Sequence, residues 1–184
     1  MRHVGALSLA VTTVLAVVLA GCGSSRSAAE VAGQDAVVPA DWTVVDDEPS
    51  GVSFALPSSS EPAEAQVPAA DGEEVTVRNY VAREPEAEVG FNILDVPHGE
   101  YSLDAGVQSV ASSLDGTVED AESIDVGGHD AVQGSVSFGD DNVALFQLIL
   151  IDDHVLQPLV AGESADREQL DHLFDQLVGS VDAG

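Results

Sequence analysis

The chain has 184 residues and a formal net charge of −28, with 33 acidic residues against five arginines and no lysine. Such a charge repels phosphate backbones and anionic head groups, so it argues against nucleic-acid binding and against electrostatic attachment to an acidic membrane. The length is enough for one domain with a sizeable core. Because Cys22 is the single cysteine, the folded part can hold neither a disulfide nor a thiolate metal site.

The first 21 residues are predicted to be a signal peptide. A short basic start precedes residues 6–20, which are almost wholly apolar; as a helix this run would be about 22 Å long, too short for a ~30 Å hydrocarbon core. The run closes in Leu19-Ala20-Gly21-Cys22, which resembles the lipobox of bacterial lipoprotein precursors. That resemblance implies cleavage before Cys22, a diacylglycerol on its thiol and an extracytoplasmic, membrane-anchored location. The alternative is a plain secreted protein with a stray cysteine.

After the signal peptide, residues 22–40 are predicted to be the lipidated cysteine and a flexible tether, because residues 23–40 are rich in Ser, Ala and Gly without a sustained hydrophobic period. Residues 41–182 are then a single domain. Within that domain the polar, proline-bearing stretch 58–73 predicts a long surface loop.

The first half of the domain predicts three strands and a helix. Residues 52–56 form a short strand that ends at Pro57, and residues 75–81 alternate valines with Thr76, Arg78 and Tyr80, which indicates a half-buried strand. Residues 89–96 are expected to be its hairpin partner. Ser102 should cap a helix whose apolar residues recur at helical spacing over residues 103–114.

The second half predicts four strands and a last helix. Residues 117–126 are followed by a tight Gly127-Gly128 turn into residues 130–138, and a hairpin turn leads to residues 143–151. Because residues 143–151 are apolar on both faces, this strand should be central and covered above and below. Pro158, within the strand 155–161, predicts an edge position or a bulge.

Ser164 is expected to cap the last helix, in which apolar residues between 170 and 181 form one stripe. The order strands, helix, strands, helix predicts the α+β class: one antiparallel β-sheet with helices packed across it.

Four short motifs carry a resemblance to a known fold: Trp42-Thr43-Val44-Val45, residues 51–57, residues 128–132 and Val178-Gly179-Ser180-Val181. With the order of elements, they resemble the PsbP-like sandwich of photosystem II extrinsic proteins, a Ran-binding nuclear import factor and actinobacterial LpqN-type lipoproteins. The resemblance covers residues 41–182. Since members of that fold mostly bind or stabilise other proteins and share no catalytic residues, it implies a binding module and transfers no site.

The residues themselves predict no catalytic site and no cofactor. The histidines that follow the signal peptide (His98, His129, His154 and His172) form no HExxH or close pair, and no Gly-x-Ser-x-Gly is present. We expect solvated or capping roles for His129 and His154, which begin strands just after turns, and we expect His172 to lie in water. Asp140, Asp141 and Asn142 could offer calcium three oxygens from one loop, although acids and Asn commonly occupy hairpin turns without a metal.

The sequence therefore predicts a lipid-anchored, non-catalytic envelope protein that binds or steadies another envelope component. Its expected partners are the membrane, through Cys22, and an envelope protein. Two alternatives stay open: a carrier of an apolar, lipid-like ligand between sheet and helices, and a buffer of divalent cations at the membrane surface.

Overall fold

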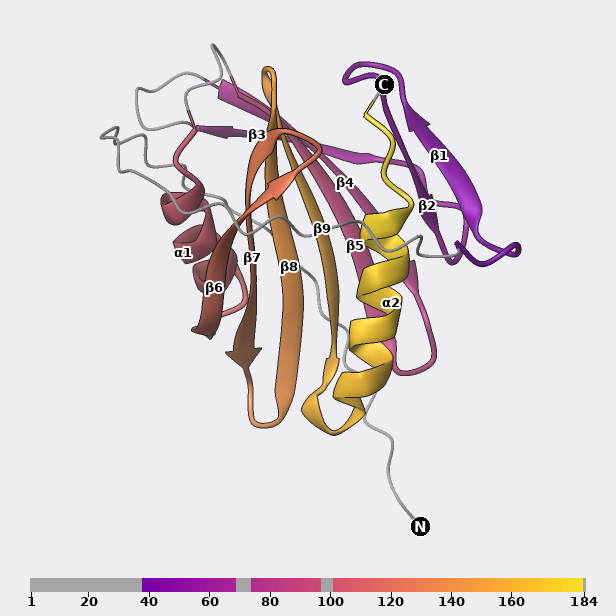
Figure 1. The fold of residues 1–184 in the computed structure, drawn as a ribbon, viewed down its shortest axis with the longest axis vertical. Helices are drawn as coiled ribbons and strands as arrows, with labels where there is room; N and C mark the ends of the chain where they lie inside the picture. The colour runs from indigo at the N-terminus through magenta and orange to yellow at the C-terminus, as the bar shows by residue number, and fades with distance from the viewer. Residues whose placement is uncertain (1–37, 69–73, 97–100, 184) are drawn as a thin grey trace.

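The computed structural model describes residues 38–68, 74–96 and 101–183. Its main feature is a twisted antiparallel sheet of seven strands with a separate two-stranded hairpin and two helices (Figure 1). The elements are β1 (Thr43–Asp47), β2 (Val52–Leu56), β3 (Ala63–Pro68), β4 (Glu74–Arg83), β5 (Ala87–Asp95), α1 (Leu103–Ser113), β6 (Thr117–Val126), β7 (His129–Phe138), β8 (Asn142–Ile151), β9 (His154–Glu163), η2 (Ser164–Asp166) and α2 (Arg167–Gly179). The predicted α+β class is confirmed.

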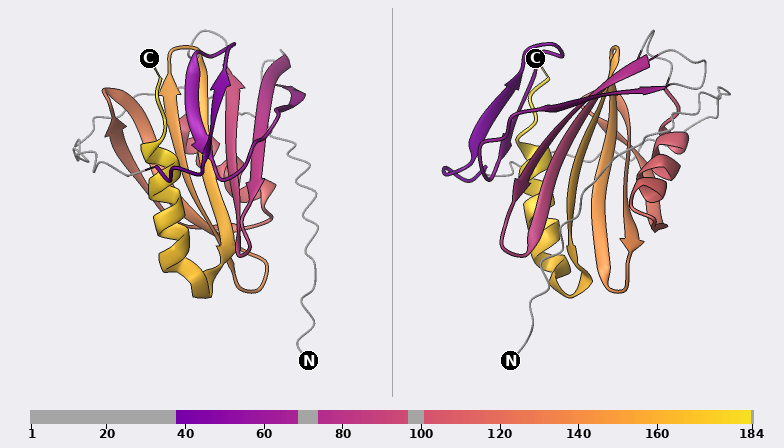
Figure 2. Two further views of the ribbon diagram at one scale, coloured as in Figure 1. Left: turned by 90° about the vertical axis from the view of Figure 1, so that its right-hand side faces the viewer. Right: turned by 180° about the vertical axis from the view of Figure 1, so that it is seen from behind.

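The seven strands lie in the order β3-β4-β5-β9-β8-β7-β6. Helix α2 packs across β9 and β8, and α1 packs across β8, β7 and β6. Successive residues of β8 point to opposite faces, and they alternate between the core under α2 and the core under α1. The helices therefore cover opposite faces of one sheet, as the front view (Figure 1) and the view from behind (Figure 2, right) show.

The apolar strand β8 has the interior place that its sequence predicts, between β9 and β7. For β9 the prediction was wrong, because Pro158 lies in an interior strand that pairs with β5 on one side and β8 on the other. The pairing with β5 runs unbroken through Phe91 and Pro158, whereas the pairing with β8 lapses opposite Gln157 and Pro158 and resumes in the same register. A missing N–H is thus tolerated inside a sheet where the ladder is interrupted on one side only.

The predicted loop 58–73 was wrong in part, because residues 63–68 form the edge strand β3 on β4. Of the remaining loop, residues 69–73 lie outside the described residues. Val67 explains the local pairing, since its side chain is buried in the core under α1 together with Val75 directly opposite. One buried valine in a polar stretch gave the sequence too weak a period to indicate a strand.

Both helices follow their apolar stripes, but only one cap is as predicted. The Ser102 hydroxyl accepts a hydrogen bond from the Ala105 amide and begins α1, as expected. Ser164 instead begins the short 3-10 helix η2, and α2 starts at Arg167 with no side-chain cap. Leu170, Phe174 and Leu177 nevertheless form the buried stripe of α2.

The turn between β6 and β7 depends on two glycines. Gly127 and Gly128 join β6 to β7 with φ of +62° and +90°, values that favour residues without a side chain. This two-residue turn holds the long β6–β7 hairpin in register.

Neither helix among the described residues has the length and apolarity needed to cross a membrane.

Candidate functional site

The strongest cluster of buried charges in the described part of the chain begins at the β1–β2 hairpin. Asp47, the last residue of β1, is only 2% exposed. Its Oδ2 accepts hydrogen bonds from the Ser50 hydroxyl (2.6 Å) and the Ser50 amide (3.1 Å) in the hairpin turn. The turn therefore fixes one carboxylate oxygen and leaves the other to face the main sheet.

The partner of Asp47 is Arg78, from the middle of β4, which is 3% exposed. Arg78 Nε donates to Asp47 Oδ1 over 2.8 Å, and the Tyr80 hydroxyl donates to the same oxygen over 2.7 Å. The other two guanidinium nitrogens of Arg78 donate to the two oxygens of Asp95, at the end of β5, over 2.7 Å each. One guanidinium thus joins the hairpin to two neighbouring strands of the sheet.

The protonation states follow from these contacts. Burial alone would raise the pKa of Asp47, but the hydrogen bonds from Ser50, Tyr80 and Arg78 outweigh it and leave that pKa below its ordinary value. The hydrogen bonds from Arg78 to Asp95 raise the pKa of the guanidinium, and burial raises the pKa of Tyr80. Asp47 and Arg78 are therefore a charged pair, and Tyr80 is neutral at physiological pH.

The cluster reaches solvent at its other end. The side chain of Asp95 is 37% exposed, and His154 at the start of β9 lies beside it, with 3.1 Å between its Nδ1 and Asp95 Oδ1. His154 was expected to be solvated or capping, and it is instead half-buried against this carboxylate. The series Asp47–Arg78–Asp95–His154 runs from β1 of the hairpin to β4, β5 and β9 of the seven-stranded sheet.

Sequence reasoning missed the three buried members of this cluster. It assigned Arg78 and Tyr80 to the polar side of β4, whereas both are buried and Val81, on the opposite side, is 41% exposed. The sequence did contain one signal. Positions 78, 80 and 82 lie on the same face of the strand, and there the arginine is followed by a tyrosine and an alanine, which are not typical of a fully solvated face. Asp47 stands in an acidic triplet that resembles an ordinary turn, so nothing local marked it as buried.

The contacts of the cluster attach the β1–β2 hairpin to the seven-stranded sheet. Both oxygens of Asp47 accept hydrogen bonds, and all three guanidinium nitrogens of Arg78 donate. A stack of Phe54 from β2 on Phe91 from β5, with ring centroids 3.9 Å apart and planes 7° apart, joins the hairpin to the same strand region. The Asp47–Arg78 ion pair and the aromatic stack together attach the hairpin to the sheet.

The other residues singled out from the sequence are dispersed. Asp140 and Asp141 lie in the β7–β8 turn and Asn142 begins β8; the described residues include no group of three or more metal-ligating side chains around them or elsewhere. His172 is exposed on α2, as expected, with its Nε2 3.0 Å from Gln176 Nε2. Cys22, the signal peptide, nearly all of the tether and His98 lie outside the described residues.

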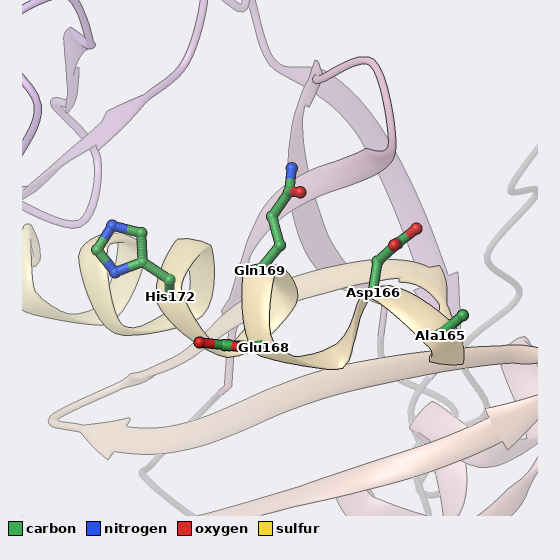
Figure 3. Close-up of a pocket in the computed structure, with 5 residues that line it drawn as sticks. All are labelled: Ala165, Asp166, Glu168, Gln169 and His172. Atoms are coloured by element: carbon green, nitrogen blue, oxygen red, sulfur yellow. The ribbon is translucent and has the colours of Figure 1, made fainter.

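An open hollow of about 490 Å³ lies on the outer side of η2 and α2. It is lined by Ala165, Asp166, Glu168, Gln169 and His172, which come from successive turns of these two helices (Figure 3). Of its acidic groups, Glu168 is exposed and Asp166 is half-buried, and water at this open surface screens them from one another. Its lining residues come from η2 and α2 alone, and none of them belongs to the buried cluster.

Comparison with solved structures gives the fold a known counterpart. The solution structure of cyanobacterial PsbP (CyanoP) from Synechocystis sp. PCC 6803 superposes with a TM-score of 0.55 at 15% sequence identity, over 89% of this chain and 98% of that one. The fold is PsbP-like. The structural part of the predicted resemblance is thereby confirmed.

A second similar structure is that of PA94, a protein of unknown function from Pseudomonas aeruginosa. Its crystal structure aligns with a TM-score of 0.41 at 16% identity, over 73% of this chain and 92% of that one. No protein-family model matches the chain, and no curated protein sequence matches it.

Proposed function

We propose that the protein is a lipid-anchored, extracytoplasmic lipoprotein of the LpqN type, whose PsbP-like domain binds or steadies another component of the cell envelope. The anchor is argued from Leu19-Ala20-Gly21-Cys22, where a small pair precedes the single cysteine. Two acyl chains on that residue are sufficient for stable attachment, at about 0.8 kcal/mol for each buried methylene. The high negative charge makes lipid, and not electrostatics, the source of membrane binding.

The observation that carries the binding role is the state of the buried Asp47–Arg78 cluster. Its donors and acceptors are bound to one another, so these buried polar and charged groups serve to attach a hairpin. A rigid sheet with a firmly attached hairpin is a suitable surface for another protein. Fold alone does not set function, so the role rests on this arrangement together with the anchor.

The packing between sheet and α2 favours a binding module over a lipid carrier. Phe54, Phe91, Leu170 and Leu177 fill the space between the hairpin, the sheet and α2, and each is at most 1% exposed. A carrier needs an apolar cavity of several hundred cubic ångströms to enclose a ligand. In this domain the corresponding space is occupied by the core itself.

The anchor is tested by metabolic labelling with a fatty acid. We expect the wild-type chain to carry label and to sediment with membranes, and Cys22→Ala to lose the label and either accumulate uncleaved or be released. Cys22→Ser is a useful second variant because it keeps a polar hydrogen-bonding side chain but offers no thiol. A Cys22→Ala chain that is normally cleaved and remains in the membrane fraction would show that the lipoprotein assignment is wrong.

The binding role is tested by native mass spectrometry of the full chain after gentle detergent extraction. We expect a mass increase equal to one protein partner beyond the covalent lipid. A reproducible increase equal to one additional, non-covalent lipid and no protein would favour the carrier instead.

A further inference from the structure

Strand β6 forms an end of the seven-stranded sheet, visible at the left of the sheet in Figure 1. It pairs with β7 over its whole length, with one register shift between Val118 and Asp120. From Asp120 to Val126 the pairing is regular. Among the described residues, no strand pairs with β6 on the side away from β7.

The turn fixes which backbone groups of β6 point outward. Because Val126 and His129 flank a two-residue turn, they form a hydrogen-bonded pair, and hydrogen-bonded and non-hydrogen-bonded pairs alternate from there. Ala121, Ser123 and Asp125 are then the residues whose N–H and C=O groups point away from β7. All three residues are exposed.

The side chains of β6 divide this edge into two halves. On the face that α2 covers elsewhere, Asp120 and Glu122 are exposed, whereas Ile124 and Val126 are partly buried against the core. The Ser135 hydroxyl donates to Asp120 Oδ1 over 2.6 Å and orients that carboxylate. One half of the edge is therefore acidic and the other half is apolar.

We propose that this edge accepts an extended segment of a partner protein as an additional antiparallel strand. The segment carries apolar side chains opposite Val126 and Ile124, and arginine or lysine opposite Glu122 and Asp120. Outward N–H and C=O groups supply the hydrogen bonds of strand addition, and the alternating side chains supply its specificity. The inference deepens the proposed function, on which it rests for the partner being an envelope protein.

A second copy of this chain does not fit the same edge. Strand β6 has four acidic residues and no basic one: Glu119, Asp120, Glu122 and Asp125. If two β6 strands paired antiparallel, the carboxylates of one would therefore lie beside the carboxylates of the other. Like charges on paired strands are destabilising, and charged edges oppose such self-pairing. The same acids attract a basic strand, so charge selects the partner.

The test uses the full chain purified from membranes in non-ionic detergent and the heptapeptide Val-Thr-Val-Thr-Arg-Thr-Arg. Hydrogen exchange followed by NMR should show slower exchange of the Ala121, Ser123 and Asp125 amides when the peptide is added. The reversed peptide, Arg-Thr-Arg-Thr-Val-Thr-Val, places its charges opposite the apolar half in an antiparallel pairing, and it should bind at least about tenfold more weakly.

Substitutions at one position separate backbone pairing from charge attraction. Ser123→Pro removes an outward N–H while leaving the bonds to β7 intact, and we expect it to weaken peptide binding about tenfold or more. Ser123→Ala keeps the N–H and should stay within about twofold of wild type. Glu122→Gln should weaken binding and reduce its dependence on salt.

Equal binding by wild type and Ser123→Pro would overturn the inference, as would unchanged exchange of the three amides at saturating peptide. If Ser123→Pro fails to fold, the exchange pattern of the wild-type chain still decides. Since the peptide assay needs no cellular partner, its failure would exclude this edge as the binding surface without excluding the proposed function, which would then use another surface. A failure of the native mass measurement leaves the edge assay unaffected.

Discussion

Arg78 donates from two nitrogens to both carboxylate oxygens of Asp95, over 2.7 Å each, while its Nε donates to Asp47 of a separate hairpin. The side chain that closes this bridge is almost fully buried. A bidentate arginine in such a place fixes direction as well as distance. The hairpin is therefore held at a set position on the sheet.

Arg78→Met should destabilise the fold by about 3–5 kcal/mol, because it leaves the Asp47 carboxylate buried without its cation. The measurement is urea unfolding at neutral pH. Arg83→Met is the matched control on the same strand, since Arg83 is exposed and lies 3.6 Å from Glu88. That control should cost no more than about 1 kcal/mol. Similar losses in the two variants would contradict a special role for Arg78.

Asp47→Asn should remove a pH-dependent part of the stability. The folded pKa of Asp47 is lowered from 3.8, so its ionisation stabilises the fold fully above that value. The contribution is lost as the pH falls through the folded pKa. The difference in unfolding free energy between wild type and Asp47→Asn should therefore shrink below about pH 4. A difference that stays constant from neutral pH to about pH 2.5 would refute this.

Both tyrosines should resist ionisation in the folded chain. Burial raises the pKa of Tyr101 to about 12, and burial and the bond to Asp47 raise that of Tyr80. Since these are the two tyrosines in the sequence, tyrosinate absorbance at pH 11 should be about a tenth or less of the value in urea, where the pKa is near 10. These groups favour the fold below pH 10 and lose that effect as the pH rises through their folded pKa values. Substantial tyrosinate in the folded chain at pH 11 would contradict it.

Phe54→Ala should lower the midpoint of thermal unfolding by about 6–20 °C, from a loss of about 3–5 kcal/mol. The substitution removes the stack on Phe91 and an edge-on contact with Tyr80, whose ring centroid lies 5.1 Å away. Val44→Ala, in the same hairpin but at a side chain that is 65% exposed, is the control. Its midpoint should move by no more than about 2 °C.

Local rules predicted most of the sheet and both helices. The two-sided apolar pattern placed β8 inside the sheet, and Ser102 marked the start of α1. The prediction for Pro158 was wrong because the rule considers only the missing N–H of proline. It does not show that the hydrogen-bond ladder between β8 and β9 is interrupted at the same place. Such an interruption is a property of two strands and not of one.

The candidate site was less predictable for a related reason. Arg78 meets Asp47 and Asp95 across 31 and 17 residues of chain, and the pairing exists only after the hairpin folds onto the sheet. The alternation of apolar and polar residues in β4 predicts one buried and one solvent-exposed face. In the structure the hairpin and α2 cover part of that second face. The residue pattern of a single strand does not show which other elements will pack on it.

The most direct test of the binding role is photo-crosslinking in intact cells, read out by mass spectrometry. Probes would replace Ser123 on β6 and Gln169 on α2, both exposed, and Phe174 in the core. Photo-probes suit this chain because it has no lysine for amine-reactive reagents. We expect one reproducible protein adduct at a surface probe, foremost at position 123. Lipid adducts at position 174 without a protein adduct at either surface position would contradict it.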